Sequence, residues 1–232
     1  MTRSEEKELM DDPAAPRELR RGELENLCAL NRYLGGYRCA VKELRRLIRQ
    51  HRLEEFSLLD VGAGSADIAS GIARWARSKG LLAKITALDL DPLAVEIAAD
   101  RARRRREIAV VRADAAAPPF RPRSFDFVLA SQFLHHFSEE KIVELLGTWS
   151  KLARRAMIVS DLLRHPLAYH GVRLLARLFT RNVMTLTDAP LSVARAFTLA
   201  EWRELFRRAA VGRFQVDTVF PFRIVGRVEL LR

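Results

Sequence analysis

The sequence predicts an α/β fold in which a mostly parallel β-sheet is covered by helices on both faces. Short apolar runs alternate with amphipathic helical segments through the middle of the chain, beginning with FSLLDV at residues 56–61. Strands that alternate with helices of this length join through right-handed crossovers, which produce a parallel sheet. The 232 residues, 49% of them hydrophobic, suffice for one substantial core and favour a single domain.

The remaining elements follow the same logic. Further strands are expected at 83–90, 107–113, 124–131 and 156–161, with helices over about 67–79, 92–105 and 138–152. Thr198 and Glu201 form a capping-box pattern that begins a later helix. Two apolar runs on either side of Pro221, RFQVDTVF and RIVGRVELL, predict a final antiparallel pair.

The N-terminal part and one long connection depart from this alternation. Residues 1–22 have mixed charge and little periodicity, so we expect a flexible or loosely docked tail. Residues 23–54 have helical spacing interrupted at Gly35-Gly36 and predict a helical cap. The main domain is expected over 55–232, with an inserted lid at about 162–197 above the carboxyl edge of the sheet.

Composition limits the partners and the compartment. The formal net charge is +11, but only six of the 40 basic residues are Lys and Arg is scattered over nearly every segment, so no specific nucleic-acid partner is expected. Cys28 and Cys39 have neither CxxC spacing nor paired His ligands nearby, which favours a reducing cytoplasm. The sequence contains no signal-peptide core and no apolar run of membrane-span length, which leaves at most weak surface association through the lid. The oligomeric state is not predicted.

The run LLDVGAGSADIA is the strongest single motif. An apolar strand ends at Asp60-Val61, and Gly62 and Gly64 then open a tight turn into a helix, which permits the close backbone approach of a nucleoside cofactor. The next strand ends at Asp89, where a carboxylate can accept both ribose hydroxyls. A nicotinamide enzyme shares these features, but Asp67 stands at the position of the third glycine of GxGxxG, and we interpret it as a helix-opening residue.

The set LDVGAGSADIA, ALDLDP, RADAAAPPF, SFDFVLASQFLHHF and MIVSD, in this order, resembles the class I methyltransferase family over about residues 56–161. The resemblance implies a Rossmann-like sheet of seven strands, mostly parallel with an antiparallel last strand. It also implies S-adenosylmethionine as the cofactor. At the methionine end, the family pattern places Gly62 and Gly64 along the cofactor, Asp60 near its amino group, and Ser131 and Gln132 beside the methionine moiety.

The same resemblance implies the adenosine contacts. Asp89 would hold the ribose and Leu90 would pack on the adenine, while Asp114 and the backbone of Ala115 would meet the adenine amino group. The family's third glycine is Ala66 here. A side chain this small still allows the helix and strand to pack closely, so we expect it to be tolerated.

His135 is the candidate catalytic base. Methyl transfer to a hydroxyl requires removal of its proton, and His135-His136 follows the fourth strand in the crevice where an acceptor would stand. FLHHFSEE also resembles the turn of small-molecule O-methyltransferases that carries the general base, which corresponds to His135. Because adjacent His side chains are expected to point in different directions, no metal site is predicted. His165 and His170 of the lid are the next candidates for the base.

The leading hypothesis is O-methylation of a small phenolic or polyketide-type acceptor, because of His135 and an apolar, aromatic lid (Tyr169, Leu174, Phe179 and Phe197). C-methylation of a quinone-like ring is a close alternative, since a phenolic carbon acceptor needs the same deprotonation. RNA or DNA methylation is favoured by charge alone, and no Asn/Asp-Pro-Pro-Tyr motif is present. The intact cofactor motif argues against a binding module without activity.

Overall fold

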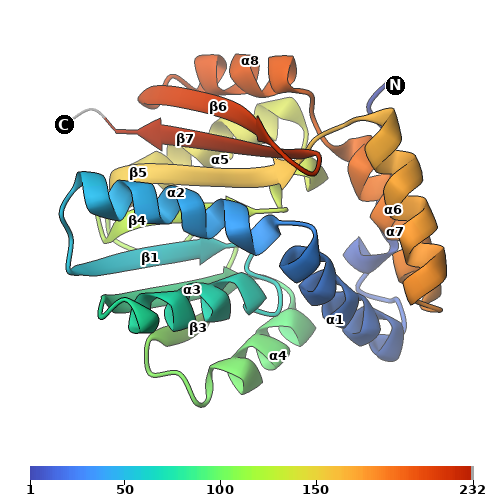
Figure 1. Ribbon diagram of the computed structural model, residues 1–232, viewed down its shortest axis with the longest axis horizontal. Coiled ribbons are helices and arrows are strands. Elements are labelled where there is room, and N and C mark those ends of the chain that lie inside the picture. Colours follow the sequence, from blue (N-terminus) through green and yellow to red (C-terminus); the bar gives the residue numbers. More distant parts are fainter. Residues whose placement is uncertain (231–232) are drawn as a thin grey trace.

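The computed structural model describes residues 1–230, so the end of the expected domain at 231–232 lies outside the described residues. It contains one seven-stranded sheet in the order β3-β2-β1-β4-β5-β7-β6 (Figure 1). The strands are β1 (Glu55–Val61), β2 (Leu82–Asp89), β3 (Ile108–Arg112), β4 (Phe125–Ser131), β5 (Ala153–Leu162), β6 (Arg213–Val219) and β7 (Arg223–Glu229). The first five strands are mutually parallel, and β7 pairs antiparallel with both β5 and β6. The predicted fold class is confirmed.

Helices cover both faces of the sheet because neighbouring strand residues point to opposite sides. On one side, Leu58 packs in a core cluster with α2 (Gly36–Gln50) and α3 (Asp67–Ser78), and Ala98 of α4 (Pro92–Ala102) joins them. On the other side, Leu59 packs with α5 (Glu139–Leu152) and α8 (Leu199–Ala209). The capping box of Thr198 and Glu201 is formed at the start of α8, as predicted.

The N-terminal segment, expected to be a flexible or loosely docked tail, is packed against the protein. A short 3-10 helix, η1 (Leu9–Asp11), has its first two N–H groups bonded to the two carboxylate oxygens of Asp188, both at 2.9 Å. Arg3 donates to the carbonyl of His135 and lies over the ring of Phe197. Helix α1 (Arg17–Tyr33) begins within the expected tail, and Gly35 separates it from α2 in a left-handed conformation. The partners of this segment lie far away in the sequence, so its local composition did not reveal them.

The predicted lid region folds into two helices, α6 (Pro166–Phe179) and α7 (Val183–Arg195), which pack against each other. Figure 1 shows them beside α1, at the end of the molecule where the parallel strands finish. Helix α7 contacts both α1 and η1. Among the described residues, no helix combines the length and apolar character needed to cross a membrane.

Candidate active site

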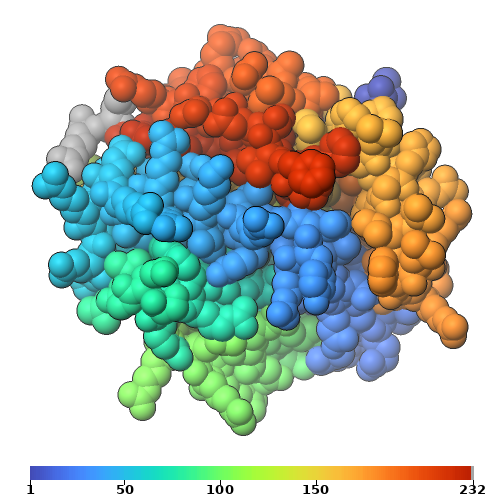
Figure 2. Space-filling model, viewed as in Figure 1, coloured from blue at the N-terminus to red at the C-terminus, as the bar shows by residue number. Residues whose placement is uncertain are grey.

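A cavity of about 600 Å³ lies at the carboxyl ends of β1, β2 and β4. Its floor includes the turn after β1 and residues Ser131 to Phe133, and its walls come from η1, α1, α6 and α7. In parallel sheets this edge is where ligands bind, because the loops after successive strands converge there. Both α1 and α7 contribute lining residues, and the space-filling view shows the blue surface of the N-terminal helices beside the orange surface of the lid (Figure 2).

The glycine turn has the backbone geometry that its sequence predicts. Gly62 and Gly64 have φ values of 64° and 52°, and a Cβ on Gly62 would lie 2.2 Å from the ring of Phe133. Ala66, at the third position of the motif, also has a positive φ of 55° and immediately precedes α3. The backbone N–H of Gly64 donates to Asp89 at 2.7 Å, so the ends of β1 and β2 are connected at the cavity.

Asp60 is the most unusual group at this turn. Its side chain is buried, and its Oδ2 atom has no hydrogen-bond partner among the described residues. Burial, reinforced by the negative charges of Asp67 and Asp89, raises the pKa of Asp60 to about 8. A buried carboxyl without a partner beside two further carboxyls is a favourable place for a cationic group of a ligand.

A polar network joins α1 to the ends of the first and fourth strands. Asn31 donates to Asp67 at 3.2 Å, and its carbonyl oxygen accepts a hydrogen bond from Gln132. The Oγ atom of Ser131 is buried without a partner, which leaves it available to a ligand. Asp67 does begin α3, as interpreted from the sequence, but it also lines the cavity. The side chain of Asn31 was not expected at this site, and Asp67 was interpreted only as a helix-opening residue.

The residues expected at the adenosine end divide into two groups. Asp89 and Leu90 line the cavity, and the exposed side chain of Leu90 presents an apolar surface there. Asp114 and Ala115 are not among the lining residues found for the described chain, where Arg112 lies instead. Asp114 accepts from the N–H of Ala116, and the carbonyl of Ala115 accepts from Trp149 at 2.8 Å. Their role toward adenine therefore stays a prediction.

His135 lies in the short 3-10 helix η2 (Leu134–His136) directly after β4. The residue is buried, and its Nδ1 atom is 2.7 Å from Oδ1 of Asp161, the penultimate residue of the neighbouring strand β5. Burial alone would raise the pKa of Asp161, but the charge and hydrogen bond of His135 outweigh it, so this pKa lies below its usual value. An ionised Asp161 fixes the proton on Nδ1 and leaves the lone pair of Nε2 free.

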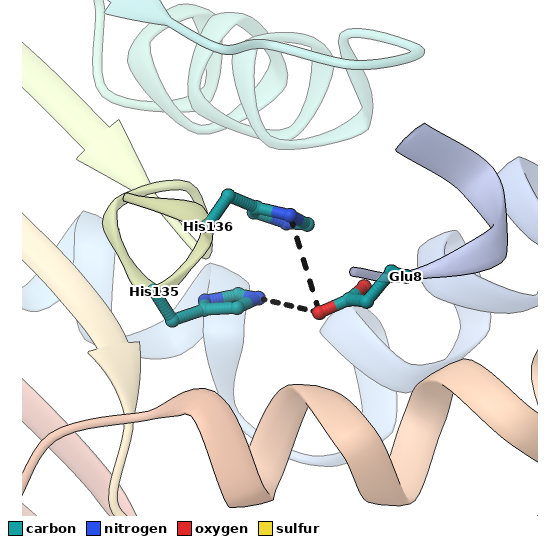
Figure 3. A group of neighbouring side chains, drawn as sticks. All are labelled: Glu8, His135 and His136. Atoms are coloured by element: carbon teal, nitrogen blue, oxygen red, sulfur yellow. Dashed lines mark ion pairs between the residues drawn. The ribbon is translucent and has the colours of Figure 1, made fainter. Parts of the chain in front are cut away.

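Glu8 faces the Nε2 side of His135. Its Oε1 atom lies 3.7 Å from Nε2 of His135 and 4.0 Å from Nδ1 of His136 (Figure 3). The two imidazole rings are 4.3 Å apart and inclined by only 32°, so the expectation that they would point in different directions is wrong. Burial raises the pKa of Glu8 to about 7, and the nearby His136 partly offsets the effect. Sequence reasoning missed Glu8 because it lies in the segment expected to be a tail.

The lid lines the cavity with different side chains from those expected. Leu174 and Phe179 are exposed, and Phe197 is packed in the core against Trp202. The lining residues of α6 and α7 are Val172, Ala189, Ser192 and Val193. The amphipathic pattern was correct, but the aromatic side chains lie away from the cavity.

The two lid histidines also lie outside the lining. His165 accepts from the N–H of Leu167 at the start of α6 and stacks on Phe222, and His170 is exposed. Neither His165 nor His170 is among the residues that line the cavity of the described chain, which leaves His135 as the better-placed base.

Comparison with known proteins agrees with this geometry. Residues 58–155 match a family model described as a methyltransferase domain. No curated protein sequence matches the chain. The plantazolicin methyltransferase BpumL, solved with a triazolic desmethylPZN analog and SAH, has a TM-score of 0.72 at 13% identity, covering 96% of this chain and 93% of that chain. Human N-acetylserotonin methyltransferase in complex with SAM has a TM-score of 0.65 at 17% identity, covering 97% of this chain and 63% of that chain. A SAM-dependent methyltransferase from Aquifex aeolicus has a TM-score of 0.64 at 15% identity, covering 90% of this chain and 98% of that chain.

The TM-scores show that the sheet shares the fold of these methyltransferases, although the sequence identities are low. The methyltransferase domain model matches residues 58–155 of this fold, less than half of the chain. The matched segment runs from within β1 to within β5 and contains the glycine turn, Asp89 and His135.

Proposed function

We propose that this enzyme transfers a methyl group from S-adenosylmethionine to a small-molecule hydroxyl, of a phenolic or polyketide-type compound. The observation that carries the proposal is the unpartnered Asp60 carboxyl beside Asp67 and Asp89, next to the glycine turn. S-adenosylmethionine has a cationic amino group and a sulfonium at one end and a ribose diol in its middle. These groups match a buried acidic cluster followed by a strand-end carboxylate.

The chain's residues can hold each part of this cofactor. Asp60 and the unpartnered Oγ of Ser131 would accept from the amino group, and the glycine turn allows the backbone to approach closely. Each oxygen of Asp89 already accepts one backbone N–H, from Gly64 or Asp91, and retains a lone pair for one ribose hydroxyl. Leu90 would pack on the adenine ring. When bound, the cofactor supplies an electrophilic methyl group on sulfur.

The acceptor hydroxyl would lose its proton to His135. Asp161 holds Nδ1, so the Nε2 lone pair is the one available to an acceptor in the cavity. His135 would accept the hydroxyl proton at Nε2, and the cofactor would supply the methyl group to the freed oxygen, with the electron pair of the broken carbon–sulfur bond kept on its sulfur. A phenolic carbon acceptor would use the same deprotonation, so C-methylation of a quinone-like ring is a variant of this proposal.

The direct test has two stages. Mass spectrometry of the purified protein is expected to reveal bound S-adenosylmethionine or S-adenosylhomocysteine. A screen of phenols and quinones should then give methylated products, whose fragmentation distinguishes oxygen from carbon acceptors. Tight binding of NAD, with no affinity for either adenosyl compound, would contradict the proposal.

Cofactor affinity is expected to rise with pH because of Asp60. With its pKa raised to about 8, this carboxyl holds a proton through much of the neutral range, and a cationic ligand binds its ionised form more strongly. Binding must therefore release protons below about pH 8. Calorimetry at pH 7 in buffers of different ionisation enthalpy measures this release. The release should be smaller in Asp60→Asn, and an equal value in both proteins would exclude Asp60 as its source.

The positive charge is expected to give only nonspecific RNA binding. Counterion release makes such binding weaken steeply as salt rises, because it depends on the number of phosphates contacted. A filter-binding titration with transfer RNA should show affinity that collapses toward physiological salt. Sequence-selective binding that persists there, or methyl label incorporated into RNA, would favour an RNA methyltransferase instead.

A further inference from the structure

Three potential metal-binding atoms converge at one edge of the cavity. They are Oε1 of Glu8, a nitrogen of His135 and a nitrogen of His136, and they all lie within 4.8 Å of one another. Figure 3 shows both imidazoles extending from η2 toward the Glu8 carboxylate, which comes from the N-terminal segment. Tetrahedral zinc, with ligands at about 2.0 to 2.1 Å, separates them by roughly 3.4 Å. The distances of 3.7 and 4.0 Å from Glu8 to the two rings are slightly longer, so a small inward shift would complete the geometry.

The Glu8 carboxylate has an unmet need for a partner. The residue is only 3% exposed, and its Oε1 atom has no hydrogen-bond partner among the described residues. The Nε atom of Arg195 lies 3.8 Å from Oε1 but donates to the carbonyl of His135. A buried acceptor without a donor is costly unless a ligand satisfies it.

The surroundings of His135 match those of a metal-bound histidine. Histidine ligands commonly donate their second N–H to a carboxylate, which fixes the ring and its tautomer. Asp161 accepts in this way from Nδ1, leaving Nε2 toward Glu8.

The local charge is mixed. Oδ2 of Asp11 lies 3.2 Å from Nδ1 of His136 and would exchange that contact for the attraction of a bound cation. Above about pH 7, where Glu8 is ionised, the negative charges of Glu8, Asp11 and Asp161 exceed the positive charges of the nearby Arg3 and Arg195 guanidiniums, which favours a cation over an anion.

We propose that Glu8, His135 and His136 form a binding site for one divalent transition-metal ion, with Zn²⁺ as the best match to two imidazoles and one carboxylate. Three protein ligands leave the fourth zinc position available to a water molecule or a ligand in the cavity. Zinc would occupy the Nε2 lone pair that accepts a proton in the proposed reaction. The resulting inhibition of methyl transfer rests on the proposed function, whereas the binding of zinc does not.

Calorimetric titration of the chelator-stripped protein with Zn²⁺ tests the site directly. We expect one tight equivalent per chain in the wild type. Glu8→Gln removes the anionic ligand with little change of shape and should weaken binding at least tenfold, as should His136→Gln. Glu5→Gln, an exposed change on the same segment, and His170→Ala should leave the affinity unchanged.

Cobalt provides a second readout, because tetrahedral Co²⁺ has a characteristic visible absorption that depends on its ligands. That absorption should appear in the wild type and be lost in Glu8→Gln. Equal zinc affinity in the wild type and Glu8→Gln, or no stoichiometric zinc binding, would overturn the proposal. Affinity for S-adenosylhomocysteine is measured on the same samples, so failure of the cofactor assignment is distinguished from failure of the metal site.

Discussion

Replacing His135 by Ala is expected to lower kcat about a hundredfold or more, because general-base assistance is typically worth that much. His135 lines the cavity, and Asp161 holds its Nδ1 atom, so we expect the other nitrogen to take the acceptor's proton. Affinity for S-adenosylhomocysteine should stay nearly unchanged, since the base acts only in the chemical step. Assays with the chelator-stripped enzyme measure both quantities.

Three controls separate a base from a structural residue. His136→Ala should cost much less activity, and Asp161→Asn should lower turnover at least tenfold because the imidazole loses the group that fixes its tautomer. If the acceptor is a phenol that ionises unaided, the penalty in His135→Ala should shrink as pH rises. A loss of activity independent of pH, together with a lower Tm and weaker cofactor binding, would mean that His135 is structural.

Replacing Asp89 by Ala is expected to weaken cofactor binding by about a hundredfold or more. Two charge-assisted hydrogen bonds to the ribose, each contributing roughly 1.5 to 3 kcal/mol, would be lost. The same carboxylate accepts from Gly64 at 2.7 Å and Asp91 at 3.0 Å, so its removal also leaves the glycine turn without a partner. Calorimetry with S-adenosylhomocysteine measures the loss.

Asp89→Asn separates these two effects, because an amide keeps one accepting oxygen and similar shape but loses the charge. It should retain more of the wild-type Tm than Asp89→Ala while still binding the cofactor more weakly. Asp100→Ala, an exposed change on α4, serves as the control and should leave affinity unchanged. Unchanged affinity in Asp89→Ala would contradict the assignment of the ribose site.

The sheet and its helices could be predicted because local patterns determine them. Each strand of the parallel part is a short apolar run, and Asp60 and Asp89 end β1 and β2 where the sequence places them. The glycine turn, the capping box of Thr198 and the antiparallel end are likewise specified by neighbouring residues. Such features depend on backbone conformation and periodicity, which a single sequence displays.

The contacts across the cavity could not be predicted in the same way. Glu8 meets His135 only because Asp188 binds the N–H groups of η1, and nothing in the local sequence of that segment indicates this partner. The lid was recognised as amphipathic, but helical spacing alone does not show which elements an apolar face will meet. Phe179 was therefore expected to face the cavity, whereas the structure leaves its side chain exposed.

The docking of the N-terminal segment has a consequence for the order in which the enzyme can be assembled. Residues 3–11 are synthesised before their partners Asp188 and Arg195, from which they are separated by 179 and 192 residues. Contacts of such high sequence separation form only when most of the loop entropy has been lost. The cavity wall that carries Glu8 therefore cannot close during synthesis of the sheet's first strands. Its completion requires that α7 has folded.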